Sequence, residues 1–476
     1  MTGDRAPDLL VVGAGLAGLA SGVRAGELGL KATVLEASSE ALHLCNSRFT
    51  GGLFHIAMDD MAAEPAKVAE NLRRATGGAM DVRLARTLAT NARRTLGWLE
   101  RQGVRLIKAG PDGLRRHALA PPGVRQTGLN WRGRSGDVML RTLERRLTAL
   151  GGEVLRGHEA QSLVLENGRC QGVFVSVDGG AVRAMIARNV LLADGGFQAD
   201  PDLVRRHISP APERLLMRNA RTGRGLGLRM AMEAGAAATG LDAFYGHVQH
   251  RDAMTDARLW PYPVLDSLAT AGLLVDGNAR RFCDEGLGGV YVTNAIARLA
   301  DPLSAWVIFD DSVWRGPGRN WLLPANPFLP AAGGRIVSAP DLASLARDTG
   351  LDPARLMQSA ASFSAAAKGR ASFDPPRRTG VYEAWPLETP PYHAVPLCAG
   401  VTYTMGGILT DERARVLDQQ GQLIAGLLAA GATTGGLEGG PLCGYSGGLS
   451  KSAVFGVIAA ETAFTFQPHD EKALPA

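Results

Sequence analysis

Residues 8–36 read DLLVVGAGLAGLASGVRAGELGLKATVLE, and this stretch decides the fold. It begins with a short apolar strand at residues 8–12 and continues as a helix pattern to about residue 28. The turn between them carries the spacing G-x-G-x-x-G, formed by Gly13, Gly15 and Gly18. The first glycine allows a tight turn, the second lets backbone approach a pyrophosphate, and the third lets helix and strand pack closely. The pattern predicts a dinucleotide site, and a tight turn without ligand is the alternative.

A second strand is expected at about residues 31–35, and Glu36 closes it. Glu36 lies 21 residues after Gly15, close to the roughly 20 expected for an acid that accepts ribose hydroxyls. An acid here favours an unphosphorylated ribose, and therefore FAD or NAD over NADP. The expected cofactor-binding residues of this segment also include Ala17 and Ala37.

The composition is that of a folded globular protein. The chain has 476 residues, 46% of them hydrophobic and 20% charged, which allows two or three domains. Of its 51 basic residues six are Lys, so 45 are Arg, and these are scattered singly or in pairs. Because there is no block of five or six like charges, we expect no nucleic-acid partner, while an anionic substrate stays open.

The five cysteines are odd in number and widely spaced, and none forms C-x-x-C. This favours reduced thiols, a cytoplasmic location and no zinc or iron–sulfur site, so no metal is expected. No run of 18 apolar residues occurs, and therefore no transmembrane segment is expected.

The loop after the second strand is rich in small polar residues. Its candidate cofactor-binding residues are Asn46, Ser47, Thr50, Gly51 and Gly52. Small donors and close backbone approach would suit a flavin ring and its ribityl-phosphate chain. The alternative is an ordinary surface loop.

At this point the chain resembles a known family. The glycine motif, Glu36 and N-S-R-F-T-G-G at residues 46–52 resemble the FAD-dependent fumarate reductase/succinate dehydrogenase flavoprotein superfamily. Glycine-rich elements at residues 193–196, 401–418 and 423–463 follow in family order, so the resemblance covers nearly the whole chain. The segment 272–285 looks closest to tricarballylate dehydrogenase-like members, and 3-ketosteroid dehydrogenase-like members are the other near branch.

The resemblance implies an α/β fold with a Rossmann-like FAD-binding domain and an inserted α+β capping domain. Between residues 238 and 345 the strand–helix alternation fades and Trp, Tyr, Pro and His become frequent. We therefore expect the FAD-binding domain at residues 1–237 and 346–476, with the cap at 238–345.

The resemblance also implies FAD as cofactor. The matching cofactor-binding residues beyond the first 52 are Ala160, Asp194, Gly195, Gly196, Thr222, Gly223, Gly225, Gly435, Gly436, Leu449 and Ser450. Asp194 departs from the Thr of the family. Covalent attachment in succinate dehydrogenase-type members uses a His in H-T-x-x-A, where this chain has Cys45-Asn46-Ser47, so non-covalent FAD is favoured.

Catalytic residues carry over from two branches. In the fumarate reductase type, His247 matches the His entering the cap, and Arg251 could meet a carboxylate. Tyr403 and Tyr445 stand where that type has His and Arg, which makes fumarate reduction less favoured. In the ketosteroid type, one Tyr acts as base and another polarises the ketone, and Tyr291 and Tyr445 fall near those places. Each tyrosine could instead be a core residue with a satisfied hydroxyl.

We therefore expect an FAD-dependent dehydrogenase acting on CH–CH groups. It would move hydride between flavin N5 and a C–C bond beside the carbonyl or carboxylate of a small acid or ketone, with an electron acceptor that the sequence does not identify. The alternatives are a flavin-binding protein that has lost catalysis and a fumarate-type ene reductase. An NAD(P)H- or disulfide-linked flavoprotein is disfavoured, because a second G-x-G-x-x-G and a redox cysteine pair are missing from the sequence.

Overall fold

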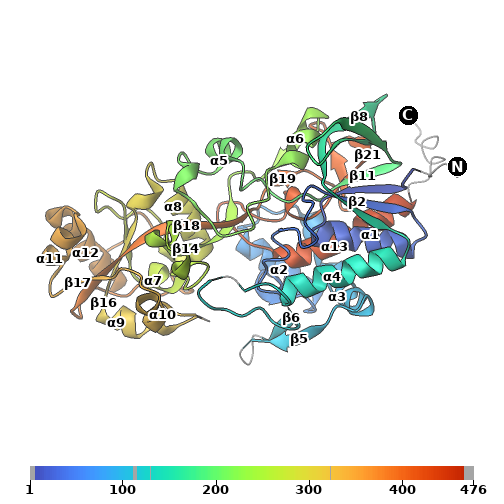
Figure 1. The fold of residues 1–476 in the computed structure, drawn as a ribbon. Coiled ribbons are helices and arrows are strands. Elements are labelled where there is room, and N and C mark those ends of the chain that lie inside the picture. Colours follow the sequence, from blue (N-terminus) through green and yellow to red (C-terminus); the bar gives the residue numbers. More distant parts are fainter. Residues whose placement is uncertain (1–5, 111–114, 129, 322, 466–476) are drawn as a thin grey trace.

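The computed structural model describes residues 6–110, 115–128, 130–321 and 323–465. Figure 1 shows an elongated molecule with two halves, one around β2, β11 and α1 and the other around β16, β17 and α12. Helix α1 (Leu16–Glu27) packs against α13 (Gly448–Thr465), so the two ends of the described chain build the same half (Figure 1).

A nine-stranded sheet forms the first half. Its parallel centre has, in spatial order, β21 (Leu423–Ala429), β11 (Asn189–Leu192), β1 (Leu9–Val12), β2 (Ala32–Glu36) and β7 (Glu153–Arg156). Its remaining strands are β8 (His158–Glu166), β9 (Arg169–Val177), β10 (Val182–Ile186) and β20 (Arg415–Leu417).

Strand β1 is buried on both faces. Leu9 and Val11 belong to one hydrophobic core, while Leu10 and Val12 belong to the other. Strands inside a parallel sheet are covered by structure on both sides, which is why this stretch is uniformly apolar instead of alternating.

Helices and a small sheet complete this half. The hydrophobic core that contains Leu9 and Val11 also contains residues of α1, α13, α2 (Pro65–Ala75), α3 (Val82–Arg101) and α4 (Ser135–Ala149). Helix α3 begins after Asp81, whose carboxylate accepts hydrogen bonds from the backbone N–H of residues 83 and 84. The four-stranded sheet consists of β3 (Leu53–Ile56), β4 (Asp59–Asp60), β5 (Leu106–Ala109) and β6 (Arg116–Leu119).

A six-stranded sheet forms the second half, and its central strand is the thirteen-residue β18 (Tyr392–Thr404). The other strands are β12 (Leu216–Met217), β14 (Phe244–His250), β15 (Leu273–Val275), β16 (Trp306–Asp310) and β17 (Val337–Ala339). Its helices are α7 (Asp266–Ala271), α8 (Gly289–Ala297), α9 (Asp311–Arg315), α10 (Ala325–Ala331), α11 (Leu342–Thr349) and α12 (Pro353–Ala367). Figure 1 shows β18 running from this half toward the first.

The expected domain boundary at 345/346 divides elements that pack together. Helices α11 and α12 share a hydrophobic core with β15 and β16, and β18 pairs with β14, β16 and β17. These contacts favour a proposal in which the cap runs to about residue 404 and the second FAD-binding segment begins after it. The ends of the chain, residues 1–5 and 466–476, lie outside the described residues.

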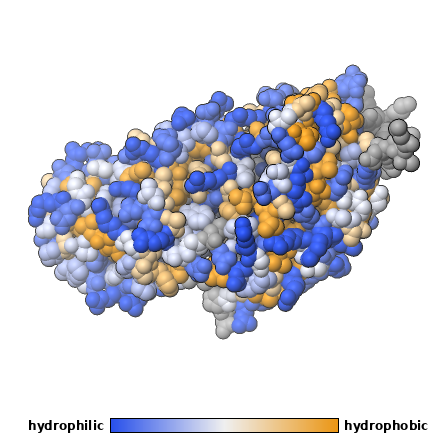
Figure 2. Space-filling view, viewed as in Figure 1, coloured by the Kyte–Doolittle hydropathy of each residue, from blue (hydrophilic) through white to orange (hydrophobic). Residues whose placement is uncertain are grey.

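The remaining regular elements join the halves: α5 (Pro201–His207), α6 (Leu226–Glu233) and the two-stranded sheet of β13 (Ala238–Thr239) and β19 (Gly407–Ile408). On the face seen in Figure 2, hydrophilic residues are spread over both halves instead of forming one block. None of the helices in the described part of the chain is long and apolar enough to cross a membrane.

Candidate active site

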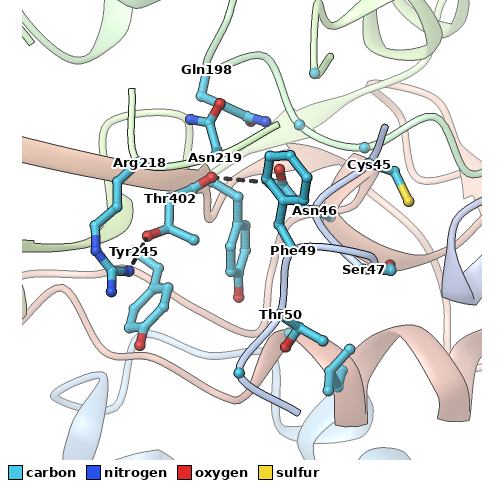
Figure 3. Close-up of a pocket in the computed structure, with 18 of the residues that line it drawn as sticks. Cys45, Asn46, Ser47, Phe49, Thr50, Gln198, Arg218, Asn219, Tyr245 and Thr402 are labelled. Atoms are coloured by element: carbon cyan, nitrogen blue, oxygen red, sulfur yellow. Dashed lines mark hydrogen bonds between the residues drawn. The ribbon is translucent and has the colours of Figure 1, made fainter. Parts of the chain in front are cut away.

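A cavity of about 1890 Å³ is lined by residues from both halves. We call residues 12–17, 35–40, 44–53 and 193–196 the cofactor wall. We call Arg218, Tyr245, His247, Asp266, Tyr403 and Tyr445 the cap wall. Figure 3 shows part of both walls, with Arg218 and Tyr245 side by side and Asn46, Phe49 and Thr50 across from them.

Most residues expected at the site from the sequence line this cavity. These are Gly13, Gly15, Ala17, Glu36, Ala37, Asn46, Ser47, Thr50, Gly51, Gly52, Ala160, Asp194, Gly195, Gly196, Thr222, Gly223, His247, Tyr403, Tyr445 and Leu449. The others lie outside its lining: Gly18, Gly225, Arg251, Tyr291, Gly435, Gly436 and Ser450.

The three glycines of the opening motif have different surroundings. A Cβ on Gly13 would lie 2.6 Å from the Ala193 carbonyl oxygen, and one on Gly18 would lie 2.0 Å from the Gly13 carbonyl oxygen. Gly15 borders the cavity, and a Cβ there would have Ser47 Oγ as its nearest atom, at 3.5 Å. Gly13 and Gly18 therefore serve close packing of strand and helix, while Gly15 leaves room for a ligand at the α1 N-terminus.

Glu36 stands at the end of β2 with its carboxylate at the cavity. Its Oε1 accepts a hydrogen bond from the Ser38 backbone N–H at 2.9 Å, and its Oε2 lies 3.8 Å from His43 Nε2. A carboxylate can accept several hydrogen bonds, so Glu36 can also accept the hydroxyls of a ribose.

Asn46 ties the cofactor wall to the second half. Its Nδ2 donates to the Thr402 carbonyl oxygen at 3.0 Å, and its Oδ1 accepts from the Ala220 N–H at 3.0 Å (Figure 3). Beside it, Ser47 Oγ accepts from the Leu16 N–H at 3.1 Å and thereby holds the loop against the start of α1.

Asp194 has a structural reason to replace the family's Thr. It is half-buried two residues after β11, where its carboxylate accepts from the Gly227 N–H at 2.8 Å and from Thr433 Oγ1 at 3.0 Å. Burial raises the pKa of this carboxyl group above its ordinary value. Asp194 therefore links its own segment to those of Gly227 and Thr433 beside the cavity.

The cofactor wall fits FAD. A close-packed turn, an acid at a strand end, a loop of small donors and the N-terminus of α13 follow one another along a single cavity. They offer, in turn, partners for pyrophosphate, ribose, ribityl chain and the electron-rich end of a flavin.

On the cap wall, three side chains form a hydrogen-bonded row. The Tyr245 hydroxyl lies 3.0 Å from His247 Nε2, and His247 Nδ1 lies 2.7 Å from Asp266 Oδ2. The second oxygen of Asp266 accepts from the Val248 N–H at 2.9 Å. Tyr245 and His247 come from β14 and Asp266 begins α7.

Tyr445 stacks on Tyr245, with ring centroids 3.7 Å apart and planes at 10°. Its hydroxyl oxygen accepts from the Gly448 N–H at 3.1 Å, so its own proton remains available to the cavity. Burial raises the pKa of the Tyr445 hydroxyl well above its usual range, and the hydroxyl therefore stays protonated at neutral pH.

Tyr403 is held by a buried network. Its hydroxyl donates to Glu438 Oε1 at 2.7 Å, and Lys451 Nζ donates to Glu438 Oε2 at 3.1 Å. Lys451 also donates to the Thr434 carbonyl oxygen at 2.7 Å. Because the Tyr403 proton is committed to Glu438, this tyrosine presents an acceptor oxygen to the cavity.

Two expected catalytic residues point elsewhere. Tyr291 on α8 packs against the small cluster around Ala243, Met405 and Cys443. Arg251 donates to the Ala305 carbonyl oxygen at 3.0 Å and lies over the Trp306 ring at 4.8 Å. Neither residue borders the cavity, so neither would contact a substrate bound there.

Arg218, Tyr245 and Asp266 also line the cavity but were not predicted from the sequence. Alternate positions on a strand share a face, so Tyr245 could have been paired with His247 two residues on. Arg218 Nη1 lies 3.4 Å from Thr402 Oγ1, and its guanidinium lies over the Tyr262 ring at 5.2 Å. Nothing in the local sequence indicates that Arg218 or Asp266 reaches this cavity.

The chain is similar to known flavoproteins. The family model described as FAD binding domain matches residues 8–446. Fumarate reductase (cytochrome) of Shewanella frigidimarina is 25% identical over 469 residues, covering 96% of this chain and 76% of the relative. 4-Oxocyclohex-2-ene-1-carboxylate 5-dehydrogenase of Sinomonas cyclohexanicum is 30% identical over 227 residues, covering 43% of this chain and 38% of the relative.

Among solved structures, 3-ketosteroid delta1-dehydrogenase from Sterolibacterium denitrificans has a TM-score of 0.73 at 20% identity, covering 96% of this chain and 99% of that one. Its likeness confirms the predicted fold, an FAD-binding domain with a capping domain. The matches also confirm the predicted superfamily and the predicted cofactor, FAD.

Proposed function

Because the chain belongs to the FAD binding domain family and is an FAD-dependent oxidoreductase of CH–CH groups, we propose that it dehydrogenates a C–C bond beside a ketone. We further propose that the substrate carries an anionic group. FAD, when bound, supplies the hydride acceptor. The residues of the cavity must then bind the ketone oxygen, hold the anionic group and take a proton.

The observation that supports a ketone substrate is the position of Tyr445, which lies three residues before α13. Its hydroxyl already accepts from the Gly448 N–H, so the proton it can give points to a partner in the cavity. A ketone oxygen there would receive that proton as a hydrogen bond, near the positive end of an 18-residue helix. Donors aimed at an oxygen that becomes more negative in the transition state are a large source of rate acceleration.

Arg218 supports an anionic substrate. It lines the cavity beside Tyr245, and no carboxylate of the described residues forms a salt bridge with it. A guanidinium without a carboxylate partner is suited to bind a carboxylate of the ligand. The substrate in the name of one relative, 4-oxocyclohex-2-ene-1-carboxylate 5-dehydrogenase, combines a ketone and a carboxylate in one small ring.

A fumarate-type ene reductase is the second candidate, favoured by the relative that covers 96% of this chain. Tyr403 and Tyr445 in place of His and Arg favour a ketone substrate instead.

We also propose non-covalent FAD and a position near the tricarballylate dehydrogenase-like branch, on the motif at residues 272–285. A cytoplasmic location is proposed because all five cysteines are unpaired. The electron acceptor stays open.

The test uses FAD-loaded enzyme without oxygen. We expect 4-oxocyclohexane-1-carboxylate to bleach the oxidised flavin faster than cyclohexanone, and succinate to have no effect. Reoxidation of the photoreduced enzyme by fumarate, but not by cyclic enones, would instead establish the ene reductase. If neither class of compound exchanges electrons with the flavin, the protein binds FAD without this catalysis.

A further inference from the structure

We propose that Tyr245 is the base that takes the substrate proton, and that His247 and Asp266 are positioning residues that accept the proton Tyr245 gives up. This inference rests on the proposed function and adds to it the path of the proton. Its basis is the row of hydrogen bonds on the cap wall, in which each member lies within 3.0 Å of the next.

The direction of the row follows from the chemistry of its members. A carboxylate can only accept, so Asp266 requires the proton of His247 on Nδ1. Neutral imidazole then has Nε2 free as an acceptor, and the Tyr245 hydroxyl donates to it. The Val248 N–H holds the other oxygen of Asp266, which fixes the carboxylate and with it the imidazole.

Burial explains why the tyrosine needs this row. It raises the pKa of the Tyr245 hydroxyl to about 12, so a free phenolate is rare at neutral pH. A neutral tyrosine can act as a base only if its own proton leaves as the new one arrives. His247 Nε2 is placed to receive it.

The other groups facing Tyr245 leave this path intact. Its charged and titratable neighbours are Arg125, Arg218, Tyr262, Asp266, Tyr403 and Tyr445. Arg218 lowers the pKa of Tyr245, while the Asp266 and Tyr262 charges raise it. Stacking on Tyr445 places the proposed base directly against the residue proposed to hold the ketone oxygen, as removal of an α-proton requires.

The step balances. The C–H bond beside the ketone breaks, and its proton goes to the Tyr245 oxygen as the Tyr245 proton passes to His247 Nε2. The electrons of that bond form the new C=C bond, and the next carbon loses hydride, for which FAD is the acceptor. His247 becomes a cation paired with Asp266, and it later returns the proton to water.

The experiment measures two events on the same FAD-loaded enzyme with 4-oxocyclohexane-1-carboxylate. Flavin bleaching reports dehydrogenation, and exchange of the ketone's α-hydrogens with D₂O reports proton removal alone. We expect Tyr245→Phe to slow both by about 10²–10⁴-fold and His247→Gln and Asp266→Asn by at least about 10-fold. Tyr392→Phe, which removes a tyrosine hydroxyl on β18 outside the cavity lining, is the control and leaves both unchanged.

The split between kcat and KM separates a relay from simple support of the fold. His247→Gln should lower kcat for the keto acid and leave its KM near the wild-type value. Bleaching that is insensitive to Tyr245→Phe would overturn the relay and keep the proposed function. Exchange that depends on Tyr245 but occurs without bleaching would keep the relay and overturn the proposed function, and the absence of both events overturns both.

Discussion

The cofactor wall is rich in glycine and small residues, whereas the cap wall presents large polar side chains. Glycines such as Gly15 let main chain approach a ligand closely. The cap wall gathers three tyrosine hydroxyls, an imidazole, a carboxylate and a guanidinium. We infer that changes in the cofactor wall affect folding and FAD binding together, while changes in the cap wall affect turnover and spare the fold.

The buried pair Glu438–Lys451 supports Tyr403 of the cap wall and should give the largest effect. Both side chains are at most 1% exposed, and Glu438 also holds Tyr403. Glu438→Gln would leave a buried ammonium without its partner, and we expect a loss of about 3–5 kcal/mol of unfolding free energy. Denaturant unfolding measures this loss. The matched control is Glu64→Gln at the exposed Arg93 pair, with a change below about 1 kcal/mol.

Tyr445→Phe tests the cap wall. Loss of the hydroxyl that we propose to bind the ketone oxygen should lower the rate of flavin bleaching by about 10²–10³-fold, or about 2.7–4 kcal/mol. The melting temperature and the amount of bound FAD should stay near the wild-type values. An unchanged rate would show that Tyr445 does not bind the reacting carbonyl.

Gly18→Val tests the close packing of α1 that supports the cofactor wall. The new side chain would meet the Gly13 carbonyl oxygen at 2.0 Å, and backbone there cannot move without separating α1 from β1. We expect a loss of about 3 kcal/mol of stability together with weakened FAD binding. Gly97→Ala on α3, whose nearest contact would be 3.4 Å to a flexible Arg101 end, should change neither. A stable, colourless Gly18→Val protein would separate the two effects that we expect to coincide.

His55 gives the fold a predictable pH dependence. Burial lowers the pKa of His55 from 6.5 to about 4, and its Nδ1 accepts from the Met58 N–H at 3.3 Å. The unfolded chain therefore binds the proton first as pH falls. The stabilisation is complete above pH 6.5 and is lost toward pH 4, by about 3 kcal/mol in all. Unfolding free energies across this range should show the decline, and His55→Gln should reduce it while His117→Gln keeps it.

Arg218→Met should have the smallest effect and the most selective one. Loss of a charged hydrogen-bond donor to a carboxylate is worth about 1.5–3 kcal/mol, so KM for the keto acid should rise about 10- to 100-fold. The KM for cyclohexanone, which lacks the carboxylate, should hardly change. Equal effects on the two ketones would argue against an anionic substrate.

Local patterns in the sequence were sufficient for the nucleotide-binding unit, and the family resemblance added the cap and FAD. The apolar strand, the spaced glycines and Glu36 act within one strand–turn–helix–strand unit, so their spacing alone predicts their arrangement. The domain boundaries were harder to predict from the sequence. Strand β18 lies far along the chain from β14, β16 and β17 and yet pairs with them. Such pairing depends on packing between distant segments, which single-sequence patterns do not contain.

The candidate catalytic residues show the same limit. His247 could be chosen from its place on the strand entering the cap, but its partner Asp266 is 19 residues away on another element. Tyr291 and Tyr445 looked alike as candidates, and both pack against the cluster of Ala243, Met405 and Cys443, but of the two it is Tyr445 that also lines the cavity.

The sequence by itself determined that a nucleotide turn forms, because a glycine that no Cβ can replace is a local backbone requirement, and its family resemblance implied FAD as the cofactor. Only the tertiary structure decided which polar groups meet: Tyr245 with His247 and Asp266, and Tyr403 with Glu438. The physical reason is that a hydrogen bond needs atoms about 3 Å apart, and for residues on different elements that distance follows from how the elements pack.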